Sequence, residues 1–170
     1  MRKALLAIAV LTTSLAAPLL AQQDFMKSTI VSRLKNSRDF TLKVADEMPD
    51  SDYAFKLTKE QMSFAQQMAH IGESFSYFLA TLTGQKPEET KPATMGKADV
   101  IKFVRSSYDK AIGDVEKLSP AQLEKTYQTP EGKTDGLTTL IAMLEHAAHH
   151  RACAEMYLRA KGIKPPSYMD

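Results

Sequence analysis

The strongest constraint on the fold of this chain is a repeat of apolar residues at spacings that alternate between three and four. Such a repeat places one apolar stripe along an α-helix and lets neighbouring helices interlock their side chains. Two segments show it without interruption: Phe64, Met68, Ile71, Phe75, Phe78 and Leu82, and later Ile101, Val104, Tyr108, Ala111, Val115 and Leu118. No segment alternates convincingly with the period of two typical of a strand, so the sequence predicts an all-α fold without a sheet.

Proline, glycine and capping residues divide the chain into four long helices. The second is predicted to begin at Thr58, which can form a capping box with Gln61, and to end at Gly84. The predicted long helices cover residues 24–47, 58–83, 97–118 and 134–161, with a loop at 84–96, one short helical turn after Ser119 and another loop at 128–136. Four long amphipathic helices in one unit predict a four-helix bundle.

The first 21 residues have the pattern of a secretory signal peptide. Arg2 and Lys3 form a basic head, an uncharged apolar run follows from Ala4 to Ala17, and the first acidic residue is Asp24. This run is too short for a membrane-spanning helix, which needs about 20 apolar residues. We expect cleavage after Ala21, a bundle domain over residues 22–170, and a periplasmic or secreted protein without stable membrane insertion.

Charge and cysteine content exclude two further classes. Without Arg2 and Lys3, 20 basic residues balance 20 acidic ones, so the exported domain carries no net charge and is not expected to bind nucleic acid. One cysteine, Cys153, cannot form an internal disulfide. The helix stripes also leave room for a homodimer through an unused apolar face.

The chemistry of the chain is concentrated in its histidines. His146 and His150 are one helical turn apart and occupy stripe positions where a bundle helix normally presents apolar side chains. An unpaired imidazole in a core costs roughly 1–3 kcal/mol, so these rings need partners, and a metal ion would serve both. His70, in the middle of the second helix, could lie at the same level. Pairs of histidines one turn apart also occur by chance on solvent-facing helices, so the alternative is a plain bundle whose histidines have no joint role.

Several recognisable sites are absent from the sequence. It contains no Cys-x-x-Cys-His motif for covalent haem, no Glu-x-x-His pair of the di-iron kind, no His-Glu-x-x-His motif and no glycine-rich phosphate loop. A serine nucleophile triad has no support either.

The histidine of the second helix, the His-x-x-x-His of the last helix with Arg151 after it, and two further stretches together resemble a known family. Those stretches are Met48 to Ile71, with Pro49, Tyr53, Phe55, Thr58, Gln61 and Phe64, and Tyr157-Leu158-Arg159-Ala160-Lys161-Gly162 with Pro165-Pro166. The family is the DinB/YfiT-like superfamily of metalloenzymes, and the resemblance covers nearly the whole chain after the leader. It implies a bundle with an unusual up-down-down-up connection.

The resemblance also implies that His70, His146 and His150 hold one divalent metal ion. Three neutral imidazoles suit Zn²⁺, Ni²⁺ or Fe²⁺ without choosing among them. Such a site is typical of metal-dependent hydrolysis or group transfer on a small molecule that the sequence does not identify. The alternative is a non-catalytic, metal-binding or stress-related bundle. Many relatives lack a leader, and export would separate this chain from the cytosolic thiols that some relatives use.

Four residues near the predicted ligands have open roles. Cys153 replaces a glutamine found in many relatives; it could be a fourth ligand or a site of oxidation, although a small buried apolar side chain is favoured. Glu73 and Tyr77 are the nearest candidates for a catalytic base, but a surface carboxylate and a core tyrosine are favoured. His149 is rotated away from the stripe and is expected to face solvent.

Overall fold

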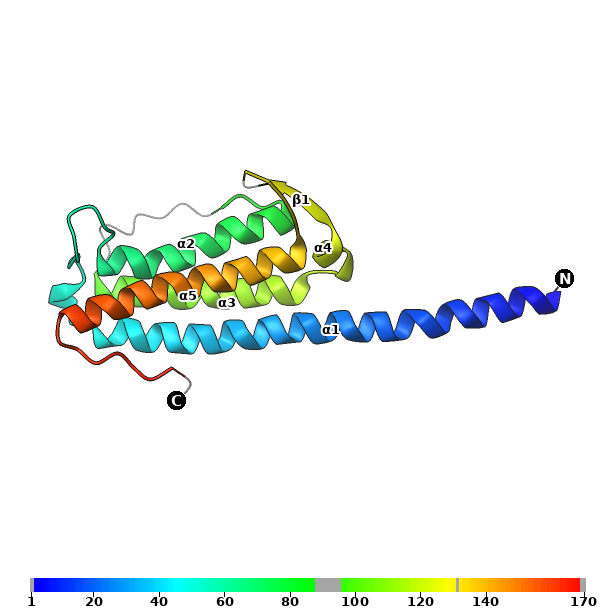
Figure 1. Ribbon diagram of the computed structural model, residues 1–170, viewed down its shortest axis with the longest axis horizontal. Coiled ribbons are helices and arrows are strands. Elements are labelled where there is room, and N and C mark those ends of the chain that lie inside the picture. Colours follow the sequence, from blue (N-terminus) through cyan, green and yellow to red (C-terminus); the bar gives the residue numbers. More distant parts are fainter. Residues whose placement is uncertain (1, 88–95, 131, 169–170) are drawn as a thin grey trace.

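The computed structural model is a bundle of four long helices with a small hairpin at one end (Figure 1). It describes residues 2–87, 96–130 and 132–168, with side chains described for Gln22 and from Asp24 onward. The long helices are α1 (Arg2–Glu47), α2 (Phe64–Thr83), α3 (Lys97–Lys117) and α5 (Gly136–Ala160). They confirm the predicted all-α four-helix bundle.

The helices follow the up-down-down-up order that the family resemblance implies. α2 and α3 run in the same direction, opposite to α1 and α5 (Figure 1). α1 packs against α3 and α5, and α2 packs against the same two helices. α5 is therefore flanked by α1 and α2, and its side chains can contribute to two separate interhelical layers.

The predicted stripes form the centre of the bundle. Large side chains from all four helices are fully buried there, among them Leu34, Phe75, Tyr108 and Met143. Ring packing adds to this core, since Phe75 and Tyr108 meet edge to face with centroids 4.6 Å apart. The apolar repeat therefore predicted the packing faces of α2 and α3 correctly.

The start of α2 differs from the prediction. The helix begins at Phe64 behind a capping box of Ser63 and Gln66, whereas Thr58 and Gln61 form only a turn. The segment before it contains the short 3-10 helix η1 (Asp50–Asp52) and is fastened by the Tyr53 hydroxyl, which donates to the Ala45 carbonyl at 2.6 Å. Both Ser/Thr-x-x-Gln patterns suit a helix start, and the packing of this loop selects the second.

The segment between α3 and α5 contains a short helix and a hairpin. The predicted turn after Ser119 is α4 (Pro120–Glu124), with a capping box of Ser119 and Gln122. The prediction of no sheet was wrong, because β1 (Thr126–Thr129) pairs antiparallel with β2 (Gly132–Asp135). Strands of four residues are too short to give a clear alternation. The hairpin lies beside the C-terminal end of α2 and the N-terminal end of α5 (Figure 1).

The helix ends meet the other expectations. Gly84 caps α2 with a φ of 72°, and Asp135 caps α5 by accepting from the Thr138 amide. The predicted loop at 84–96 lies largely outside the described residues.

The start of α1 differs from the prediction. The helix begins at Arg2 rather than near Asp24, and its first half projects beyond the bundle (Figure 1). Within the described part of the chain, no helix combines the length and apolarity needed to cross a membrane.

Candidate metal centre

His70 from α2 and His146 and His150 from α5 meet in one cluster. One ring nitrogen from each lies within 4.8 Å of the corresponding nitrogens of the other two. The ring centroids are 5.1 Å apart for His70 and His146 and 4.5 Å apart for the other two pairs. All three side chains are half-buried. The structure thus brings together the three histidines that the sequence singled out.

The helices explain why these residues converge. His146 and His150 are one turn apart on α5, so both rings project toward the same neighbour. His70 lies off the main α2 stripe, but α2 contacts α3 and α5 at once, and its buried arc is correspondingly wide. Gln67 and Ser74, on the His70 side of α2, are buried as well. The off-stripe rotation of His70 therefore directs it to α5 rather than to solvent.

Hydrogen bonds orient two of the rings. His150 Nδ1 lies 2.7 Å from the Gln67 side-chain oxygen, which can only accept, so Nδ1 carries the proton and donates. His70 Nδ1 lies 3.4 Å from Glu73 Oε2, an arrangement that favours the same tautomer. In both rings the lone pair is then on Nε2. Such outer partners are the usual means of orienting a metal-binding imidazole.

Burial favours the neutral form of the two α5 histidines, His146 and His150. It lowers the pKa of His150 to about 4, with smaller contributions from His146 and His70. Burial also lowers the pKa of His146, followed by the effects of His70 and His149. At neutral pH both α5 rings therefore carry a free lone pair, as metal binding requires.

One atom of the cluster has no partner. His146 Nε2 is the single buried side-chain nitrogen or oxygen among the described residues that makes no hydrogen bond. Leaving a buried polar atom unpaired costs roughly 1–3 kcal/mol, and native proteins rarely retain one without a reason. The donor set of three imidazoles and this unpaired nitrogen both fit a divalent metal ion.

The cluster opens into a cavity of about 560 Å³ between α2, α5 and the hairpin. Its walls are mostly apolar or hydroxyl-bearing, and Glu73 is the acid among them. The lining residues are His70, Glu73, Ser74, Tyr77, Phe78, Thr81, Thr129, Thr134, Thr139, Ala142 and His146. This volume is within the range of about 300–1,000 Å³ of small-molecule sites. The hairpin threonines were missed by the sequence reasoning, because the hairpin itself was missed.

Of the four side-chain expectations, one is confirmed, one is met in part and two are wrong. His149 is exposed as expected, whereas Glu73 is half-buried at the cavity with its carboxylate 3.4 Å from His70 Nδ1, and so is only in part a surface carboxylate. Tyr77 is 48% exposed and stands on the cavity wall, so it is not a core tyrosine. Cys153 is only partly buried, and its sulfur lies 3.9 Å from His149 Nε2, outside the histidine cluster. Its position therefore does not support a fourth ligand.

Comparison with known proteins adds independent information. The model of the DinB superfamily matches residues 33–154. The uncharacterized protein YjoA of Bacillus subtilis is 25% identical over 143 residues, covering 78% of this chain and 89% of YjoA. The crystal structure of YjoA matches with a TM-score of 0.69 and covers 82% of this chain and 97% of its own.

Two further solved structures share the fold at 14% identity. A DinB-like protein of Bacillus cereus gives a TM-score of 0.72 and covers 81% of this chain and 94% of its own. YfiT of Bacillus subtilis gives a TM-score of 0.65 and covers 81% of this chain and 89% of its own. It is described as a probable metal-dependent hydrolase with an unusual four-helix bundle topology.

Proposed function

The chain belongs to the DinB superfamily, and we propose that it is a mononuclear metalloenzyme, a hydrolase or transferase, with its ion held by His70, His146 and His150. The observation that carries the proposal is the buried, unpartnered Nε2 of His146, a residue that also lines a cavity of small-molecule size. A ligand set buried without a cavity would favour a structural ion instead. The description of YfiT as a probable metal-dependent hydrolase supports the same reading.

The chain's own residues prepare the site. Gln67 accepts a hydrogen bond from His150 Nδ1 and Glu73 faces His70 Nδ1, so that each histidine keeps its Nε2 available. Three imidazole ligands leave at least one coordination position without a protein donor, and Cys153 does not fill it. When bound, a Zn²⁺, Ni²⁺ or Fe²⁺ ion would supply a Lewis acid next to the cavity.

The cavity restricts the substrate. Phe78 and Ala142 present apolar surface, and the hydroxyls of Thr129, Thr134 and Thr139 already donate to backbone carbonyls. Among the described residues no lysine or arginine lines the cavity, so an anionic group of a substrate would find no cation among them other than the bound ion. These walls favour a largely apolar small molecule with the reacting polar group directed at the histidines.

The first test is elemental analysis of protein purified without chelator from cells that express the full chain. We expect near-stoichiometric zinc, nickel or iron, and one azide ion bound per metal, because azide needs an open coordination position. Metal-free protein that takes up no added Zn²⁺ or Ni²⁺ would overturn the proposal. A filled site that binds no azide would favour the alternative, a non-catalytic metal-binding or stress-related bundle.

We also propose that residues 1–21 are removed during export to the periplasm or the medium. The support is the basic head at Arg2 and Lys3 and the apolar run that follows. After expression of the full chain in a Gram-negative host, the periplasmic fraction should contain protein that begins at Gln22. Recovery of the uncleaved chain in the cytoplasm alone would contradict this part of the proposal.

A further inference from the structure

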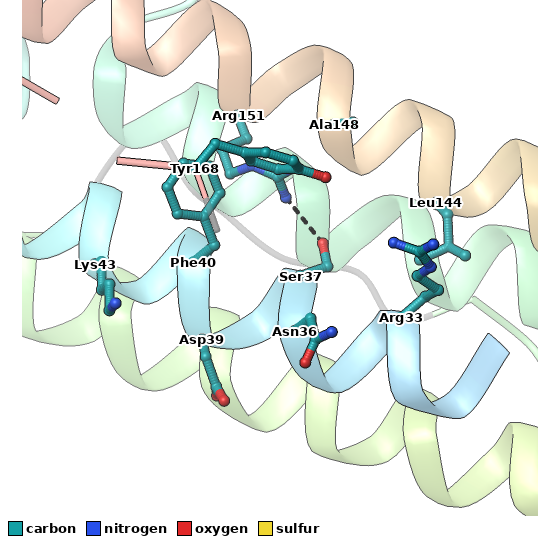
Figure 2. A pocket seen from close by; sticks show the side chains of 10 residues that line it. All are labelled: Arg33, Asn36, Ser37, Asp39, Phe40, Lys43, Leu144, Ala148, Arg151 and Tyr168. Atoms are coloured by element: carbon teal, nitrogen blue, oxygen red, sulfur yellow. Dashed lines mark hydrogen bonds between the residues drawn. The ribbon is translucent and has the colours of Figure 1, made fainter. Parts of the chain in front are cut away.

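Arg151, the neighbour of His150 on α5, points away from the histidines toward α1. It is 6% exposed, and its Nη1 donates to Ser37 Oγ at 2.9 Å and to Thr41 Oγ1 at 3.3 Å. Its guanidinium carbon lies 4.9 Å from the Phe40 ring and 6.0 Å from the Tyr168 ring (Figure 2). Arg151 is therefore a buried cation held by hydroxyls and rings.

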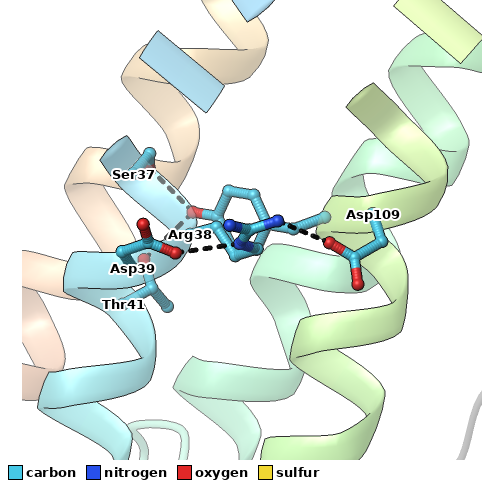
Figure 3. A network of polar contacts seen from close by, with 6 residues as sticks. Ser37, Arg38, Asp39, Thr41 and Asp109 are labelled. Atoms are coloured by element: carbon cyan, nitrogen blue, oxygen red, sulfur yellow. Dashed lines mark hydrogen bonds and ion pairs between the residues drawn. The ribbon is translucent and has the colours of Figure 1, made fainter. Parts of the chain in front are cut away.

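No carboxylate in the described part of the chain lies within 4.0 Å of this guanidinium. The nearby acids Asp39 and Asp109 are both bound by Arg38, at 2.9 and 2.8 Å (Figure 3). The hydroxyls of Ser37 and Thr41 also contact the Tyr108 hydroxyl and carry no charge. A buried cation without a counter-ion is uncommon, because taking a charge out of water is costly unless an opposite charge compensates it.

A cavity of about 640 Å³ opens against Arg151 between α1 and α5. Arg33 and Lys43 add two more basic side chains to its lining, and Asp39, the one acid among the described lining residues, is bound by Arg38. The remaining walls include the apolar side chains of Leu144 and Ala148 and the rings of Phe40 and Tyr168 (Figure 2). The cavity is thus positively charged and has an apolar wall.

Arg151 also has donors to spare. Both of its hydrogen bonds leave from Nη1, so Nε and Nη2 make none among the described residues. A guanidinium offers five N–H groups in a planar fork that matches a carboxylate. The free donors belong to a side chain that itself lines the cavity.

We propose that this cavity is a second ligand site, specific for a small organic carboxylate with an aromatic or aliphatic body. The guanidinium of Arg151 receives the carboxylate, Arg33 attracts it, and the body lies against Phe40, Leu144 and Tyr168. The site is separate from the histidine cavity, since the two share no lining residue. The inference goes beyond the proposed metalloenzyme function and does not depend on it.

Benzoate is a suitable probe and benzamide its neutral counterpart. In an NMR titration of the purified protein, benzoate should bind saturably with a Kd of about 1 mM or lower, and benzamide about tenfold more weakly. The largest shifts of backbone amides should come from residues 36–40 and 144–151. Saturable binding of benzoate and benzamide with equal affinity would overturn the proposal, and so would an absence of saturation up to about 20 mM.

Substitutions around the cavity test where benzoate binds and leave the buried Arg151 in place. Ala148→Phe fills the cavity and should abolish benzoate binding, because Ala148 is exposed and the larger ring can be accommodated at the surface. Arg33→Gln should weaken binding about threefold, whereas Arg105→Gln, an exposed arginine on α3, should change nothing. Unchanged binding in Ala148→Phe, or shifts centred on Thr134 and Ala142, would place benzoate elsewhere and overturn the proposal.

Discussion

Two polar clusters lie on opposite sides of α5. One lacks a cation for its ring nitrogens, and the other lacks an anion for its buried arginine. On the α2 side, the ring nitrogens of His70, His146 and His150 converge, and the buried His146 Nε2 has no hydrogen-bond partner. On the α1 side, Arg151 is a buried cation with hydroxyl and ring partners but no carboxylate among the described residues. The first cluster suits a cation and the second an anion.

The difference shows how one helix supports two kinds of chemistry. Consecutive residues of an α-helix are about 100° apart, so His150 and Arg151 face different neighbours although they are adjacent in sequence. Because the α1 hydroxyls of Ser37 and Thr41 bind both Arg151 and the Tyr108 hydroxyl of α3, this cluster can hold three helices together without a ligand. In the histidine cluster, by contrast, the buried His146 Nε2 has no protein partner, and an added metal ion would supply one.

The largest expected effect is loss of metal in His146→Gln. The substitution removes the nitrogen that has no protein partner, and two remaining imidazoles hold an ion weakly. Affinity for Zn²⁺ or Ni²⁺ should fall by more than about 100-fold, as measured by competition with a chelating dye. His149→Gln is the matched control, because His149 lies on the same helix but is exposed. Equal losses in the two variants would mean that the cluster is not the metal site.

A smaller effect is expected when the support of His150 is removed. Gln67→Leu leaves His150 Nδ1 without its acceptor, and metal affinity should fall about 10–100-fold. Gln67→Glu retains an acceptor oxygen and should restore most of the affinity. If the glutamate variant binds metal no better than the leucine variant, Gln67 acts through packing alone.

Acidic pH should destabilise the metal-free fold through His150 on α5. The pKa of His150 is about 4 in the fold, against about 6.5 for an unfolded histidine, so between these values the unfolded chain binds more protons. The free energy of unfolding of the metal-free protein should therefore decrease as the pH falls from about 6.5 to 4. Denaturant titrations at several pH values should show a shallower dependence in His150→Gln than in His149→Gln. Identical pH profiles for these variants would contradict the assignment.

The smallest effect on the metal is expected from the other side of α5. Tyr108→Phe removes a fully buried hydroxyl that contacts Ser37 and Thr41, and should destabilise the fold by about 1–2 kcal/mol. Metal affinity should change by less than about twofold, since the two clusters share no contact. Tyr77→Phe, on an exposed tyrosine, is the stability control. A metal loss in Tyr108→Phe that exceeds its loss of stability would show that the clusters are coupled.

The sequence predicted the bundle and the histidines better than it predicted the walls around them. The stripe from Phe64 to Leu82 and the spacing of His146 and His150 depend on helix geometry, which is local, and both are confirmed. The start at Thr58 was wrong because two capping patterns compete and the loop contacts of Tyr53 decide between them. The hairpin was missed because its strands are held by pairing and by the adjacent helices.

By itself the sequence determined which faces of the helices are apolar, where most of them end, and that two imidazoles replace apolar residues on the last one. Only the tertiary structure decided that α2 lies beside α5, so that His70 completes the cluster and Gln67 orients His150. It likewise decided that Arg151 meets Ser37 and Thr41 and opens on a cavity. The physical reason is range: helix periodicity is set within a few residues, whereas the partners of a buried polar group come from whichever helix packs against it.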